Sequence, residues 1–81
     1  MTAAITIRFD HHDDAWRILC QASSGQCFLW RNGNFVRSAT YVPGSGLKGA
    51  EGLGAGVLPK MLSGLRPHER VIAELQNLAH S

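Results

Sequence analysis

The stretch "FLWRNGNFVR", residues 28–37, places three aromatic residues and two arginines around a single Asn-Gly pair. Asn32 and Gly33 tolerate the positive backbone φ angles that a two-residue type I′ turn requires, so the pair is a strong local signal for a β-hairpin. We therefore predict strands over 26–31 and 34–42. Counting outward from the turn gives the cross-strand pairs Trp30 with Phe35, Leu29 with Val36, and Phe28 with Arg37.

Two further strands are expected before this hairpin. Ile5, Ile7 and Phe9 alternate with polar residues, which is the pattern of a half-buried strand over 4–9. Residues 10–14 are polar and turn-prone, and 16–21 again favours an extended strand. A four-residue loop at 22–25 would pair the strands so that Cys20 lies opposite Cys27 and Ile18 opposite Leu29.

This register divides the sheet into two faces. The face predicted to pack against helices carries Trp16, Ile18, Cys20, Cys27, Leu29, Val36, Ser38, Thr40 and Val42. The other face carries Arg17, Leu19, Gln21, Phe28, Trp30, Phe35, Arg37 and Tyr41. A slip of one residue in either turn would interchange the faces, so the division depends on both turns.

The C-terminal half is predicted to be a connection followed by helices. Residues 43–56 hold six glycines, which predicts a long loop without a strand or helix interior. Apolar residues at 58, 61, 62 and 65 have helical spacing, with Gly64 suited to the helix end. Pro67 can open a second helix with an apolar stripe of Val71, Ile72, Leu75, Leu78 and Ala79. The expected fold is a single α+β domain over 1–81, with a four-stranded antiparallel meander, a Gly-rich loop and two C-terminal helices packed on one face.

Composition limits the classes of protein that this chain can belong to. It has 81 residues, of which 44% are hydrophobic and 17% charged, with a net charge of +2. These values favour an ordinary globular domain over a disordered chain, and no apolar run is long enough to span a membrane. Residues 1–4 lack the features of a secretory signal, so a cytoplasmic location is expected. Cys20 and Cys27 are too few for a disulfide scaffold and are expected to be small buried hydrophobic residues.

Motifs for catalysis, metals and cofactors are weak. The cluster at 11–14, His-His-Asp-Asp, lacks the further ligands that a closed zinc site needs, so a solvated turn is predicted and no metal. The segment 44–49 fits G-x-G-x-x-G, a motif that binds dinucleotides when it lies within a βαβ unit. The sequence predicts no such unit here, so no cofactor is expected. No serine stands in the context of a nucleophile elbow, and we expect no enzyme activity.

The face that mixes aromatic residues with arginines has three interpretations. It could be a second core, closed by a helix or by the same face of a second copy in a two-fold dimer. It could be a protein-partner surface, because Arg, Trp and Tyr are enriched in interface hot spots. It could also bind single-stranded nucleic acid through base stacking and phosphate contacts, although the small net charge disfavours this. The candidate binding residues are Arg17, Phe28, Trp30, Phe35, Arg37 and Tyr41.

The stretch Pro43-Gly44-Ser45-Gly46-Leu47 lies between the predicted antiparallel strands and the C-terminal amphipathic helix. This order of elements resembles small phage-encoded anti-CRISPR proteins of the type I class. The resemblance implies an inhibitor, encoded by a phage or mobile element, that acts without catalysis by occupying a surface on a larger host defence complex. It carries over no functional residue. The alternative function is a small regulator that binds single-stranded nucleic acid.

Overall fold

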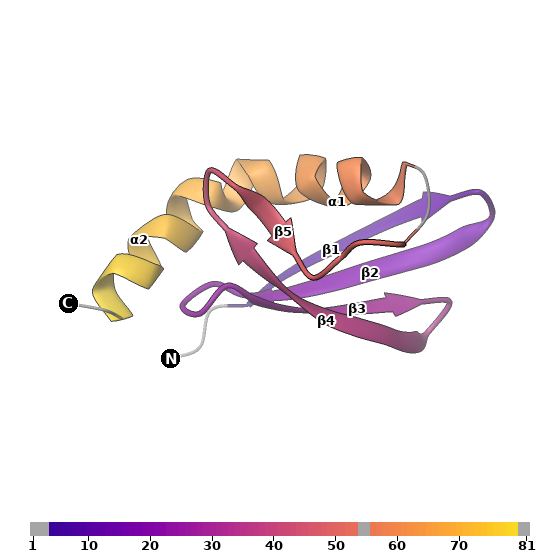
Figure 1. Ribbon diagram of the computed structural model, residues 1–81, viewed down its shortest axis with the longest axis horizontal. Coiled ribbons are helices and arrows are strands. Elements are labelled where there is room, and N and C mark those ends of the chain that lie inside the picture. The colour runs from indigo at the N-terminus through magenta and orange to yellow at the C-terminus, as the bar shows by residue number, and fades with distance from the viewer. Residues whose placement is uncertain (1–3, 54–55, 80–81) are drawn as a thin grey trace.

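The computed structural model describes residues 4–53 and 56–79, which form an antiparallel sheet with one helical segment after it (Figure 1). The α+β class and the antiparallel meander are confirmed, but the sheet has five strands in the order β1-β2-β3-β4-β5. The elements are β1 (Ala4–His11), β2 (Asp14–Gln21), β3 (Gln26–Arg31), β4 (Asn34–Val42), β5 (Gly46–Lys48), α1 (Val57–Leu65) and α2 (Glu69–Ala79), with a 3₁₀ turn at Arg66–His68.

The first two strands are joined by a tight turn rather than by the predicted five-residue loop. His12 and Asp13 have φ angles of 49° and 65°, the positive values that a two-residue type I′ turn needs at both central positions. Asp enters this left-handed region more readily than most residues, and His is also enriched there. Consequently β1 and β2 are longer than expected, and Arg8 pairs with Arg17.

The predicted Asn-Gly turn is confirmed, since Asn32 and Gly33 have φ angles of 52° and 82°. The side chain of Asn32 also ties this turn to the start of β2. Its Oδ1 accepts a hydrogen bond from the Ala15 backbone N–H at 2.8 Å, and its Nδ2 donates to Asp14 Oδ1 at 2.9 Å. The predicted pairs Cys20 with Cys27, Ile18 with Leu29, and Trp30 with Phe35 are all present.

Beyond Phe35 the predicted register is wrong, because the β3–β4 pairing shifts between Leu29 and Trp30. Leu29 lies opposite Arg37 instead of Val36, and Phe28 lies opposite Ser38 instead of Arg37. Such a β-bulge places one extra residue in a strand, here Val36 of β4. Because side chains alternate along a strand, every residue after the bulge changes face relative to the prediction. The residues affected are Arg37, Ser38, Ala39, Thr40, Tyr41 and Val42.

The glycine-rich segment contains a strand that the sequence analysis excludes. β5 pairs with the end of β4, so that Leu47 lies opposite Tyr41 and is buried. Gly44 and Gly46, with φ angles of 84° and 107°, allow the chain to reverse direction between the two strands. A three-residue strand forms here because burial of the Leu47 side chain stabilises it by more than the weak strand preference of the neighbouring glycine costs.

The C-terminal segment is one bent helical unit rather than two separate helices. The helical backbone continues from α1 through the 3₁₀ turn, which holds Pro67, directly into α2. Gly64 does not end the helix as predicted. It lies inside α1 next to β1, where a Cβ on Gly64 would stand 2.6 Å from Ile7 Cγ2.

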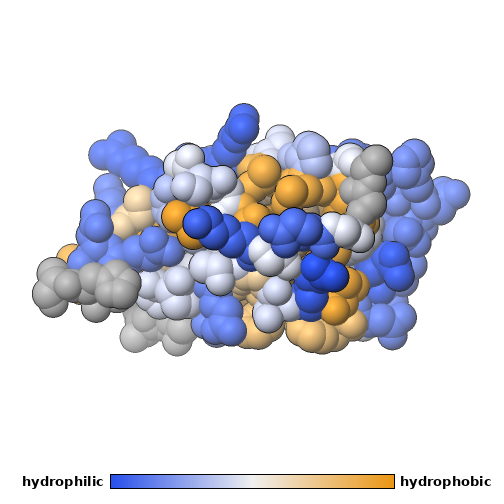
Figure 2. Space-filling model, viewed as in Figure 1, coloured by the Kyte–Doolittle hydropathy of each residue, from blue (hydrophilic) through white to orange (hydrophobic). Residues whose placement is uncertain are grey.

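The core lies between the helices and one face of the sheet, as predicted. α1 contacts both β1 and β5, the first and last strands, so the sheet curls around this helix (Figure 1). Residues that are at most 2% exposed fill the interior, namely Ile18, Cys20, Ala22, Cys27, Leu29, Tyr41, Ala50, Val57, Met61, Leu65 and Ile72. On the face seen in Figure 2, hydrophobic residues are exposed mainly near the centre, and hydrophilic ones lie mostly toward the ends.

Gly64→Val tests the close packing of α1 on β1. A valine side chain would overlap Ile7, and overpacking of this kind typically costs about 1–3 kcal/mol of the free energy of unfolding, measurable by urea denaturation. Ser63→Val is the matched control, because Ser63 is exposed in the same helix and should change stability by less than about 0.5 kcal/mol. Equal stabilities for the two variants would contradict this packing.

Candidate functional site

The side of the sheet opposite α1, here called the outer face, carries the candidate site. Its large side chains are Arg8, Arg17, Leu19, Phe28, Trp30 and Phe35. Four of them form one row across neighbouring strands, because Arg8 pairs with Arg17, Arg17 with Trp30, and Trp30 with Phe35. Leu19 and Phe28 form a second pair beside this row.

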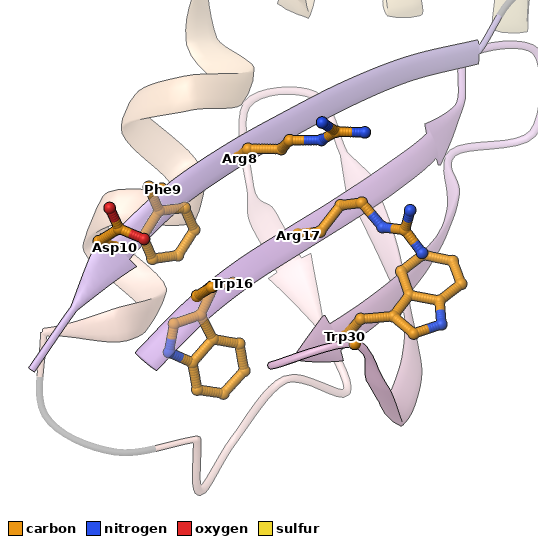
Figure 3. Close-up of a pocket in the computed structure, with 8 residues that line it drawn as sticks. Arg8, Phe9, Asp10, Trp16, Arg17 and Trp30 are labelled. Atoms are coloured by element: carbon orange, nitrogen blue, oxygen red, sulfur yellow. The ribbon is translucent and has the colours of Figure 1, made fainter. Parts of the chain in front are cut away.

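Trp30 is the centre of this row. The guanidinium carbon of Arg17 lies 4.2 Å from the centroid of the Trp30 ring, a cation–π contact visible in Figure 3. The rings of Phe28 and Phe35 approach Trp30 with centroid distances of 6.4 and 6.0 Å. These contacts hold the indole in place, so an aromatic platform is formed before any ligand arrives.

The two arginines of the outer face lie on neighbouring strands, and Asp10 is the acid that lines a hollow with them. Arg8 and Arg17 stand directly opposite each other, an arrangement of like charges that destabilises a sheet. In the part of the chain that the structure describes, neither arginine has an ion-pair partner, and the salt bridge found there joins Arg70 to Glu74 on α2. The outer face therefore carries two arginines, at paired positions of β1 and β2, that form no ion pair among the described residues.

Two shallow hollows lie along this row and share Arg8, Arg17 and Trp30. One, of ≈ 410 Å³, is lined by Arg8, Phe9, Asp10, Ala15, Trp16, Arg17, Trp30 and Gly33. The other, of ≈ 310 Å³, is lined by Thr6, Arg8, Arg17, Leu19 and Trp30. Their common residues make them neighbouring parts of one surface, which suits an extended segment of a larger molecule.

The outer face is open to solvent over the residues that the structure describes. Phe35 is 58% exposed, Arg8 is exposed, and Trp30 and Phe28 are half-buried. Since α1 packs on the opposite side of the sheet, the interpretation of this face as a second core closed by a helix is wrong. The interpretations as a surface for a protein partner, for a nucleic acid or for a second copy of the chain stay predictions.

Four of the six predicted site residues come together here, and two do not. Arg17, Phe28, Trp30 and Phe35 lie on the outer face, whereas the bulge turns Arg37 and Tyr41 to the other side. The Nη1 of Arg37 donates hydrogen bonds to the backbone oxygens of Gly49 and Glu51, at 3.3 and 2.7 Å, and so holds the loop after β5.

Tyr41 is a core residue and is only 2% exposed. Burial raises the pKa of its phenol, and nearby Glu69 raises it further. The carboxylate of Glu69 also accepts a hydrogen bond from the Gly44 backbone N–H. That amide, at the first glycine of the G-x-G-x-x-G stretch, is thus already paired with an acid.

Arg8 is a site residue that the sequence analysis misses. The alternation of Ile5, Ile7 and Phe9 places Arg8 on the opposite side of β1. The residue of β2 that lies opposite Arg8 cannot be found, however, unless the turn between the two strands is known. Had His12 and Asp13 been recognised as a two-residue turn, counting outward would have paired Arg8 with Arg17.

Comparison of the chain with protein-family models, curated proteins and solved structures finds no match. Among the described residues, no group of three or more His, Cys, Asp or Glu side chains could hold a metal ion. In the same part of the chain, no helix combines the length and apolar character that a membrane span needs.

The face assignment is tested by comparing Tyr41→Ala with Phe35→Ala. Truncating a large buried aromatic residue costs about 3–5 kcal/mol, whereas an exposed ring costs less than about 0.5 kcal/mol. Urea unfolding should therefore separate the two variants widely. If Phe35→Ala proved as destabilising as Tyr41→Ala, the register beyond the bulge would be incorrect.

Proposed function

We propose that this chain is a non-enzymatic binding protein whose outer face occupies a surface on a larger protein partner. The observation that carries the proposal is the row Arg8, Arg17, Trp30 and Phe35, which is preassembled and open to solvent, and whose arginines form no ion pair among the described residues. Trp and Arg are enriched among the residues that supply most of the energy in protein interfaces.

Rigidity supports this role. All members of the row stand on paired strands, and Trp30 is already packed by its neighbours, so little side-chain entropy is lost when a partner binds. The two arginines favour an acidic patch on the partner, since an external carboxylate would relieve their mutual repulsion.

A host defence complex is the first partner to test. The order of elements around 43–47, which resembles small type I anti-CRISPR proteins, supports an inhibitor from a phage or mobile element that acts in the cytoplasm. A binding surface built from side chains on a rigid sheet suits such an inhibitor, which needs contact rather than catalysis.

A homodimer through the outer face is disfavoured by charge. Placing two outer faces together around a two-fold axis would bring Arg8 and Arg17 of both copies into one interface. Like charges buried together cost several kcal/mol, so we expect a monomer in solution. Sedimentation or light scattering would measure this directly.

Binding to a purified type I CRISPR surveillance complex tests the proposed function. Trp30→Ala and Phe35→Ala should each weaken binding by about 10-fold or more, because both remove aromatic anchors from the contact. Val71→Ala is the control, since Val71 is also apolar and is 49% exposed, but it stands on α2. Biolayer interferometry gives the affinities, and circular dichroism checks that each variant is folded.

Two results would count against the proposal. Wild-type binding by folded Trp30→Ala and Phe35→Ala would show that the outer face is not the docking surface. Failure of the wild-type chain to bind any type I complex would remove the defence complex as partner.

Single-stranded nucleic acid is the second candidate, and the contact between Arg17 and Trp30 favours it. The Trp30 ring can stack a base once the Arg17 guanidinium that covers it moves to a phosphate, and Arg8 lies one strand further along for a second phosphate. The net charge of only +2 argues for weak binding.

The salt dependence of oligothymidine binding tests this candidate. Binding, followed by fluorescence anisotropy, should weaken steeply as salt rises, and Arg8→Ala or Arg17→Ala should each reduce the slope of log K against log salt by about 1. Arg70→Ala is the control, because Arg70 is exposed on α2 and paired with Glu74. Absence of binding at low salt would exclude this function.

A further inference from the structure

Cys20 and Cys27 face each other from neighbouring strands on the core side of the sheet. They are direct partners in the β2–β3 register, both are free thiols, and both are fully buried. The proposed binding function uses the outer face and does not involve either thiol.

The hydrogen-bond pattern of β2 and β3 determines how close the two side chains come. The Asn32 backbone N–H donates to the Ala15 oxygen at 2.7 Å, so the next pair along, Trp16 with Arg31, is a non-hydrogen-bonded pair. The two kinds of pair alternate, so Cys20 with Cys27, four residues further along each strand, is also non-hydrogen-bonded. Cα atoms in such pairs are about 4.5 Å apart, within the range that a disulfide spans.

The surroundings of the two thiols differ. Hydrogen bonding to Cys27 lowers the pKa of Cys20, although burial opposes this, whereas hydrogen bonding to Cys20 and burial both raise the pKa of Cys27. The Sγ of Cys27 donates a second hydrogen bond to the Gly25 backbone oxygen at 3.3 Å. Because Cys27 holds its proton in the hydrogen bond to Gly25, we assign the first attack on an oxidant to Cys20.

We infer that Cys20 and Cys27 are a reversible oxidation site, at which a small peroxide converts the two thiols into a cross-strand disulfide. In the first step the Cys20 sulfur attacks one peroxide oxygen, the O–O bond breaks, and a sulfenic acid and one water form. In the second step the Cys27 sulfur attacks the Cys20 sulfur, the S–O bond breaks, and a second water leaves. Two thiols and one hydrogen peroxide thus give one disulfide and two waters.

Burial sets the rate of this reaction. Because neither sulfur is exposed, an oxidant reaches Cys20 only when the β2–β3 hairpin opens locally at the turn before Gln26. The disulfide then closes a short loop across that turn and fixes the hairpin that also carries Phe28 and Trp30. Oxidation should therefore be slow in the native protein and should stabilise the hairpin once complete.

The test is oxidation of the full chain with hydrogen peroxide, followed by intact mass spectrometry and thermal unfolding. We expect the monomer to lose two hydrogen atoms, the melting temperature to rise by about 5–15 °C, and dithiothreitol to reverse both changes. Cys20→Ala and Cys27→Ala should each abolish the loss of hydrogen and the rise in melting temperature. In a second experiment the wild-type chain is unfolded in urea and refolded in the presence of peroxide. Both thiols are then accessible to the oxidant before the core forms.

Three outcomes would overturn the inference. The first is uptake of oxygen atoms without loss of hydrogen, which would show that the sulfurs oxidise separately. The second is a disulfide between chains. The third is a refolded protein whose thiols both remain free, or whose disulfide lowers the melting temperature, because then the strand pairing cannot accept the bond.

Discussion

The extra residue Val36 in β4 is the constraint on which the arrangement of the sheet depends. Before the bulge, the Asn-Gly turn fixes which residues face the helix. After it, the alternation is reversed, so Tyr41 enters the core and pairs with Leu47 of β5. Without this reversal Tyr41 would point to the outer face and Leu47 would lose its buried neighbour. The bulge also bends the strand, which is what a sheet needs in order to curl around a single helix.

Because the sheet curls around α1, one of its faces forms the core and the other stays open to solvent. One helix, α1, contacts both edge strands, so a chain of 81 residues obtains its core from a single layer of helix and keeps the rest of the sheet free. The free side holds the row from Arg8 to Phe35, where two arginines oppose each other without an acid between them. A small domain gains little stability from such a row, and this is one reason for the binding role that we propose.

Local signals in the sequence predict much of this fold. Asn32-Gly33 specifies its turn through backbone angles, and the strand alternation then places Arg17, Phe28, Trp30 and Phe35 together. The bulge at Val36 could not be predicted, because no glycine or proline marks it and it arises from packing of distant residues. β5 could not be predicted either, because the glycines around it argue against a strand, whereas burial of Leu47 favours one. The His12-Asp13 turn agrees with local preferences, but the polar run 10–14 fits a longer loop equally well.

Trp16 and Trp30 lie on the two faces of the sheet, and their accessibility tests whether the outer face is open to a partner. Acrylamide quenching of Trp30 in a Trp16→Phe variant should be strong, and it should fall when a partner binds. Quenching of Trp16 in a Trp30→Phe variant should be weak throughout, because Trp16 is only 3% exposed. Equal protection of Trp30 and Trp16 in the isolated monomer would contradict the account.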